Sequence, residues 1–211
     1  MPFTRLAAGL GMLGPALFAV MLAGLTFFKF DFLRRLGWDP LLAPTFDWPS
    51  GLALGPLGWL MTGTFLVCGL CGLLFALGLR RQTADGNWGA PLLALAGLAL
   101  AGLAFTTDPT LRSTPATLHG RLHDLSFVML GLTQMPGMLL LGASFRRSPA
   151  WAGFSGYTFA SAALALPAFF LKGLFFYLFL AAILAWSELT ALRLWKLSAL
   201  APDGLAKEEA M

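Results

Sequence analysis

The chain has 211 residues, of which 58% are apolar and 11% are charged. Soluble domains carry about 45–50% apolar and about 25% charged residues, so this composition excludes an ordinary water-soluble globule. It also excludes intrinsic disorder, which needs low hydrophobicity and high charge. The net charge of +4 is spread in small groups between apolar runs, and we expect no nucleic-acid partner. The mean hydropathy of +0.77 predicts an all-α integral membrane bundle.

Six apolar stretches are long enough, or nearly so, to cross a membrane as helices, which takes about 20 residues each. The predicted spans are Leu6 to Phe28, Pro56 to Leu79, Ala90 to Phe105, His119 to Gly142, Gly153 to Leu171 and Leu174 to Trp195. The first is too long for a signal peptide, so we expect it to be retained. The third is short, and only Lys172-Gly173 separates the last two. We expect one domain over residues 1–199 and a polar tail over residues 200–211.

The orientation of such a bundle follows from the Lys and Arg residues in its short loops. With the N-terminus inside, eight of these residues are cytoplasmic and six are outside. The eight are Arg5, Arg80, Arg81, Arg146, Arg147, Arg193, Lys196 and Lys207, and the six are Lys29, Arg34, Arg35, Arg112, Arg121 and Lys172. We therefore expect both termini on the cytoplasmic side of the cell membrane. The two outer loops would run from Lys29 to Gly55, where Trp48 is one of several interfacial aromatic residues, and from Thr106 to Leu118.

The two histidines, His119 and His123, are four residues apart and share one face of the fourth predicted span. Polar and small residues continue this face toward the middle of the membrane: Ser126, Thr133, Gln134 and Gly137. Asp108 follows the third span and reaches the same side of the membrane. One aspartate and two histidines can hold a divalent metal such as zinc and activate water. The same three residues could form a metal-free acid–base cluster, or the histidines could simply cap the helix and bind a loop.

Two further polar features lie inside predicted spans. Glu188 is expected to pair with Arg80 or Arg81 near the inner surface, since buried charges are costly in a membrane. The alternative is a proton or substrate path from His119 along Gln134 to Glu188. Cys68 and Cys71 have the C-x-x-C spacing of redox proteins, but in mid-span we expect them to pack as small apolar groups.

Small residues and prolines predict how the spans pack. The third span presents small residues on one face, which lets another helix approach closely: Ala94, Gly97, Ala101 and Ala104. Three prolines lie inside spans, where each removes a backbone hydrogen bond and favours a kink: Pro15, Pro136 and Pro167.

Several motifs resemble those of a known family. They include Trp48-Pro49-Ser50, Phe105-Thr106-Thr107-Asp108-Pro109 and His119-Gly120-Arg121-Leu122-His123. Over about residues 7 to 196, the chain resembles the bacterial and archaeal membrane proteins called domain of unknown function (DUF) family 998. The resemblance implies a six-helix bundle, distantly similar to lipid-associated families, with no established activity. It also implies that Asp108, His119 and His123, which match motif positions, are the functional centre.

Three hypotheses of function follow. The first is a non-enzymatic protein that binds or handles a lipid or small apolar ligand at an external mouth lined by the Asp/His cluster, with Trp48, Ser126 and Gln134 as ligand-binding residues. The second is a membrane metallohydrolase with Asp108, His119 and His123 as metal ligands and catalytic residues. The third is a small-solute or proton-coupled transporter, and a structural role beside another membrane protein stays open. Membrane lipids are the expected partners, and a homo-oligomer is possible.

Overall fold

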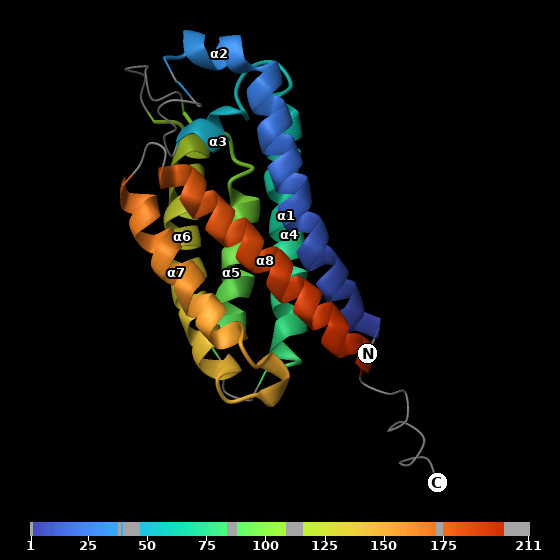
Figure 1. Ribbon diagram of the computed structural model, residues 1–211. Helices are drawn as coiled ribbons and strands as arrows, with labels where there is room; N and C mark the ends of the chain where they lie inside the picture. Colours follow the sequence, from blue (N-terminus) through green and yellow to red (C-terminus); the bar gives the residue numbers. More distant parts are fainter. Residues whose placement is uncertain are drawn as a thin grey trace.

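The computed structural model is a bundle of helices (Figure 1) and describes residues 2–37, 39, 47–83, 88–108, 116–171 and 175–200. Its helices, in chain order, are α1 (Pro2–Phe28), α2 (Phe30–Arg35), α3 (Asp47–Gly51), α4 (Gly58–Arg80), α5 (Gly89–Gly102), α6 (Leu118–Phe145), the 3-10 helix η1 (Pro149–Trp151), α7 (Phe154–Leu171) and α8 (Phe175–Leu200). The all-α membrane bundle predicted from composition is confirmed. The predicted hairpin at Lys172-Gly173 and residues 201–211 of the tail lie outside the described residues.

Five helices in the described part of the chain are long and apolar enough to cross a membrane, namely α1, α4, α6, α7 and α8. The third predicted span corresponds to α5, which has 14 residues. At about 1.5 Å per residue α5 covers about 21 Å, less than the roughly 30 Å of a bilayer core. It ends at Gly102 rather than at the predicted Phe105, and the carbonyl groups of Leu103 and Phe105, just past its end, accept hydrogen bonds from His123.

The six longer helices form a closed ring. Going around it, α1 packs against α4, α4 against α5, α5 against α6, α6 against α7, α7 against α8, and α8 against α1. Figure 1 shows α8 crossing the bundle obliquely in front of α5. The first residue of α1 and the last of α8 lie at one end of the bundle, which we call the terminal end, and α2 and α3 lie at the opposite, loop end.

The closest approach between neighbours in the ring is that of α4 and α5. A Cβ atom on Gly97 would lie 2.5 Å from the backbone nitrogen of Leu73, and one on Gly69 would overlap the backbone at Ala101. The prediction that the third span packs through small residues is thus confirmed at Gly97 and Ala101. The partner on α4, Gly69, was not predicted. Small residues let membrane helices gain van der Waals contact where lipid gives no hydrophobic drive.

The cysteines also contribute to packing inside the ring. Both thiols are free and buried, and the Cys68 Sγ lies 3.2 Å from the carbonyl oxygen of Gly14, to which it donates a hydrogen bond. This contact joins α4 to α1. The structure thus agrees with the prediction that Cys68 and Cys71 serve packing.

Lys29 is buried at the loop end, although the sequence predicted it in an external loop. Its ammonium group donates hydrogen bonds to the carbonyl oxygens of Leu52, at 2.6 Å, and Leu54, at 2.5 Å. The ring of Phe32 lies 5.2 Å from the same nitrogen. Burial lowers the pKa of this lysine. The Lys29 side chain therefore joins the end of α1 to the backbone carbonyl groups of the segment after α3.

Candidate functional site

His123 is the centre of a buried polar cluster at the loop end. Its Nδ1 atom lies 2.7 Å from the carbonyl oxygen of Phe105 and 3.2 Å from that of Leu103. Its Nε2 atom lies 2.9 Å from the hydroxyl oxygen of Ser50. Because carbonyl oxygens only accept, Nδ1 carries the proton and Nε2 accepts the hydrogen bond that Ser50 donates. One side chain of α6 thus connects α3 and the turn that follows α5.

A serine that donates to a histidine oriented by a third group has the arrangement found in activated nucleophiles. Here, however, Ser50 is only 6% exposed and His123 only 4%, so no substrate can reach the hydroxyl group in this conformation. Sequence analysis passed over Ser50 as a site residue, although it lies in a motif that carries the family resemblance. The pair fixes α3 to α6 and α5, and we treat it as a structural clasp.

Asp108 makes a second, more exposed cluster, with the start of α6. Its carboxylate accepts hydrogen bonds from the backbone N–H of Thr117, at 2.8 Å, and from the Thr117 hydroxyl, at 2.7 Å. The Thr117 side chain in turn accepts from the N–H of Gly120, at 3.0 Å, and so caps the helix. A Cβ atom on Gly120 would overlap the Asp108 carboxylate. The hydroxyl and the backbone N–H of Thr117 hold the pKa of Asp108 below its ordinary value of 3.8, helped by the neighbouring charge of His119.

The structure does not bring Asp108, His119 and His123 together as metal ligands. Among the described residues, no group of three or more His, Cys, Asp and Glu side chains is placed to hold a metal ion. Both ring nitrogens of His123 are engaged within the protein. His119 is exposed and meets the edge of the Phe105 ring, with 5.8 Å between the ring centroids. The metallohydrolase therefore stays a prediction that the geometry does not favour.

The rest of the predicted polar face of α6 divides into two kinds of residue. The hydroxyl groups of Ser126 and Thr133 donate to carbonyl groups one turn earlier in the same helix, at 2.8 Å and 2.6 Å. The donor hydrogen of each hydroxyl group is therefore used within the helix, and the ligand-binding role of Ser126 stays a prediction. Gln134 instead lines a cavity. The side chain of Trp48, the remaining predicted ligand-binding residue, lies outside the described residues.

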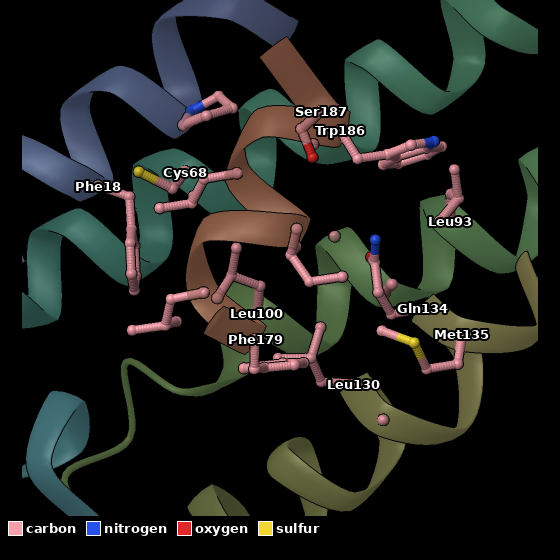
Figure 2. A pocket seen from close by; sticks show the side chains of 18 of the residues that line it. Phe18, Cys68, Leu93, Leu100, Leu130, Gln134, Met135, Phe179, Trp186 and Ser187 are labelled. Carbon is pink, nitrogen blue, oxygen red and sulfur yellow. The ribbon is translucent and has the colours of Figure 1, made fainter. Parts of the chain in front are cut away.

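The cavity lies inside the ring of helices and has a volume of about 640 Å³. All six ring helices contribute to its wall, which is almost wholly apolar and includes Pro15 and Pro136. Figure 2 shows the amide of Gln134 and the hydroxyl group of Ser187 pointing into the same space, from α6 and α8. Sequence analysis predicted Gln134 but not the cavity, because no pattern in one chain shows how six apolar faces leave a gap between them.

Three aromatic residues from α6, α7 and α8 form a cluster in the wall of the cavity. The Phe127 ring of α6 stacks on Phe169 of α7, with 5.7 Å between centroids. Phe169 also lies 5.1 Å from Phe179 of α8. All three rings line the cavity. None of the polar groups of the His123 cluster lines the cavity.

Glu188, next to Ser187 on α8, does not form the expected pair with an arginine. Within the described residues no ion pair joins it to Arg80 or Arg81. The Arg81 guanidinium lies instead over the ring of Phe3, 4.1 Å from its centroid. The proposed path from His119 through Gln134 to Glu188 also lacks a continuous polar connection among the described residues, since neither His119 nor Glu188 lines the cavity that Gln134 faces.

The motifs, the helical ring and the loop-end clusters can be compared with known proteins. A family model described as "Protein of unknown function (DUF998)" matches residues 21–193. The chain belongs to this family. The match covers α4 to α7, the last eight residues of α1 and most of α8, and so includes both loop-end clusters and most of the residues that line the cavity. Neither a curated protein nor a solved structure matches the chain. Membership in the family thus supports a membrane protein and leaves its ligand to be inferred from the structure.

Proposed function

We propose that this membrane protein binds an apolar molecule carrying one hydrogen-bonding oxygen, such as a long-chain alcohol, ester or quinone, in the central cavity. The observation that supports the proposal is a large apolar space inside the bundle whose wall carries the amide of Gln134. Small-molecule sites are typically about 300–1,000 Å³, mostly apolar, with a few polar groups that orient the ligand. The cavity, at about 640 Å³, falls within this range.

The size of the cavity argues for an occupant. The space holds about 640 Å³, and its wall is almost wholly apolar. Protein interiors are close-packed, with few voids larger than a water molecule. An apolar molecule restores the lost van der Waals contacts, whereas water would find few partners on such a wall.

Gln134 argues for a ligand with an oxygen atom. Within the described part of the chain, its amide makes no hydrogen bond, and it lies about halfway along a membrane-spanning helix. A polar group without a partner is costly there, since lipid tails offer none. A carbonyl or hydroxyl group on the ligand would supply the partner and fix the orientation of the apolar part. Ser187 faces the same space and could bind the same oxygen.

The proposed ligand site is the central cavity of the bundle, whereas the sequence predicted a site at the Asp/His cluster. Asp108 and His123 already make hydrogen bonds that connect helices, so they offer a ligand little. The clasp at His123 instead holds the end of α5 against α6, two of the helices that wall the cavity. No observation on the described residues favours metal-dependent hydrolysis or transport over binding.

We also propose that the protein lies in the cell membrane with both termini in the cytoplasm. Of the Lys and Arg residues that the structure describes, seven lie at or near the terminal end and four at the loop end. The seven are Arg5, Arg80, Arg81, Arg146, Arg147, Arg193 and Lys196. Basic residues in short loops are retained on the cytoplasmic side. Labelling of a cysteine introduced at an end of the chain, in intact cells, tests this orientation.

The ligand proposal is tested by comparing two probes of equal length, dodecanol and dodecane, on the purified protein in detergent. Dodecanol should raise the unfolding temperature more than dodecane does. Gln134→Leu should abolish this difference, because the amide that binds the hydroxyl group is gone. Thr133→Val is the matched control, since the Thr133 hydroxyl is bound within its own helix. Equal effects of both probes on the wild-type protein would contradict the role of Gln134.

A further inference from the structure

The terminal end holds a second pocket, of about 290 Å³, in the turn between α6 and α7. Arg146 and Arg147 contribute to its wall, together with Phe145, Trp151 and Ser155. It is separate from the central cavity, with which it shares no lining residue. Within the described part of the chain, no hydrogen bond or ion pair occupies either guanidinium group.

Several contacts hold this turn in one conformation. The Trp151 ring stacks on Phe145, with 4.3 Å between centroids and 12° between planes. The Trp151 indole N–H donates to the carbonyl oxygen of Gln82, at 3.2 Å. The Nε atom of Arg193, on α8, donates to the carbonyl oxygen of Ala150, at 3.0 Å. The Ser155 hydroxyl donates to the carbonyl oxygen of Gly142, at 2.8 Å.

The turn around the pocket is therefore held in place by the buried rings of Phe145 and Trp151, and the pocket carries two exposed arginines at the end of α6. We propose that it binds the phosphate group of an anionic membrane lipid. Guanidinium groups match phosphate oxygens in geometry and bind them through paired hydrogen bonds. Basic pockets between membrane helices on the cytoplasmic side suit anionic headgroups. Phe145 and Trp151 are at most 1% exposed, so they fix the turn, and the exposed arginines supply the binding groups. The acyl chains of the same lipid would stay in the bilayer beside the bundle.

A second pair of arginines serves as a control that distinguishes a specific lipid site from non-specific electrostatic attraction. Arg80 and Arg81 end α4 at the same end of the bundle and carry the same charge, but Arg81 lies over Phe3 instead of lining this pocket. If only the electrostatic field attracted anionic lipids, removing either pair would weaken binding equally. If the pocket binds the headgroup, only the Arg146 and Arg147 pair matters greatly.

The experiment measures binding of phosphatidylglycerol to the full chain in phosphatidylcholine nanodiscs, by native mass spectrometry. The variant Arg146→Gln with Arg147→Gln should lose affinity about tenfold or more, as expected for removing two basic groups. The control, Arg80→Gln with Arg81→Gln, should lose less than about threefold. Inorganic phosphate at millimolar concentration should not displace the lipid, because it lacks the acyl chains that hold a lipid in the bilayer beside the pocket.

Three outcomes would overturn the proposal. Equal losses in the two double variants would show general attraction, and no loss in either would show that the arginines are not used. Displacement by inorganic phosphate would assign the pocket to free phosphate instead of a lipid. All four arginines are exposed, so the variants should fold, and an unchanged unfolding temperature in phosphatidylcholine alone verifies this.

Discussion

The two histidines should differ sharply in their importance for stability, although the sequence gives no reason to distinguish them. Replacing His123 with leucine keeps an apolar group of similar size and removes every hydrogen bond of the ring. The carbonyl groups of Leu103 and Phe105 and the hydroxyl group of Ser50 then lose their partner. Each buried polar group left unpaired costs about 1–3 kcal/mol. The Ser50 hydroxyl can rotate to another acceptor, so the two carbonyls give an expected loss of about 3 kcal/mol.

His119→Leu is the matched control, one helical turn away on the same helix. His119 is exposed, and its ring contact with Phe105 is worth about 1 kcal/mol or less. The assay is reversible unfolding with SDS in mixed micelles, followed by the fluorescence of the seven tryptophans. Equal losses in both variants would refute the assignment of His123 as the clasp. If one zinc ion per chain were also lost in both, the predicted metal site would be supported instead.

Three further predictions concern packing, capping and the buried lysine. Gly69→Val should destabilise the protein by about 1–3 kcal/mol, because the added side chain would separate α4 from α5. Gly63→Val on the same helix is the control and should be nearly neutral, since a Cβ atom there meets nothing within 4 Å. Unfolding with SDS measures the stability of both variants. Asp108 has a lowered pKa in the folded state, so its stabilising effect is complete above its ordinary value of 3.8 and is lost as the pH falls through the folded pKa. The stability difference between the wild type and Asp108→Asn, measured against pH, should therefore shrink only below about 3.8, and a difference that shrinks between pH 7 and 5 would contradict the cap. Lys29→Met should cost about 2 kcal/mol, because it removes two charge-assisted hydrogen bonds, and unchanged stability would show that the segment after α3 is held by other contacts.

The sequence predicted the helices well because lipid allows few alternatives. A spanning segment must satisfy its backbone internally and be apolar over its length, and both properties are visible in one chain. The prediction was too long for α5, because the residues after Gly102 are as apolar as those before it. The residues just past the end of this helix are held by hydrogen bonds to His123, twenty residues away from Leu103, and such contacts leave no local pattern.

The site was predicted less well, for a related reason. The sequence singled out Asp108, His119 and His123, but their spacing fits a metal site, an acid–base cluster and a structural cap equally. The roles separate only when the partners are known: Thr117 for Asp108 and Ser50 for His123. The cavity could not be predicted at all, because it depends on how side chains of six helices meet.

The most direct test of the account is the amount of apolar molecule that co-purifies with the protein, measured by mass spectrometry of an organic extract. Gly131 lines the cavity, and a Cβ atom there meets nothing within 4 Å, so Gly131→Phe should place a ring in the space. Gly63→Phe is the control, because Gly63 is equally open but does not line the cavity. We predict about one oxygen-bearing apolar molecule per chain in the wild type and in Gly63→Phe, and a loss in Gly131→Phe. The same lipid content in all three proteins would contradict binding in the cavity.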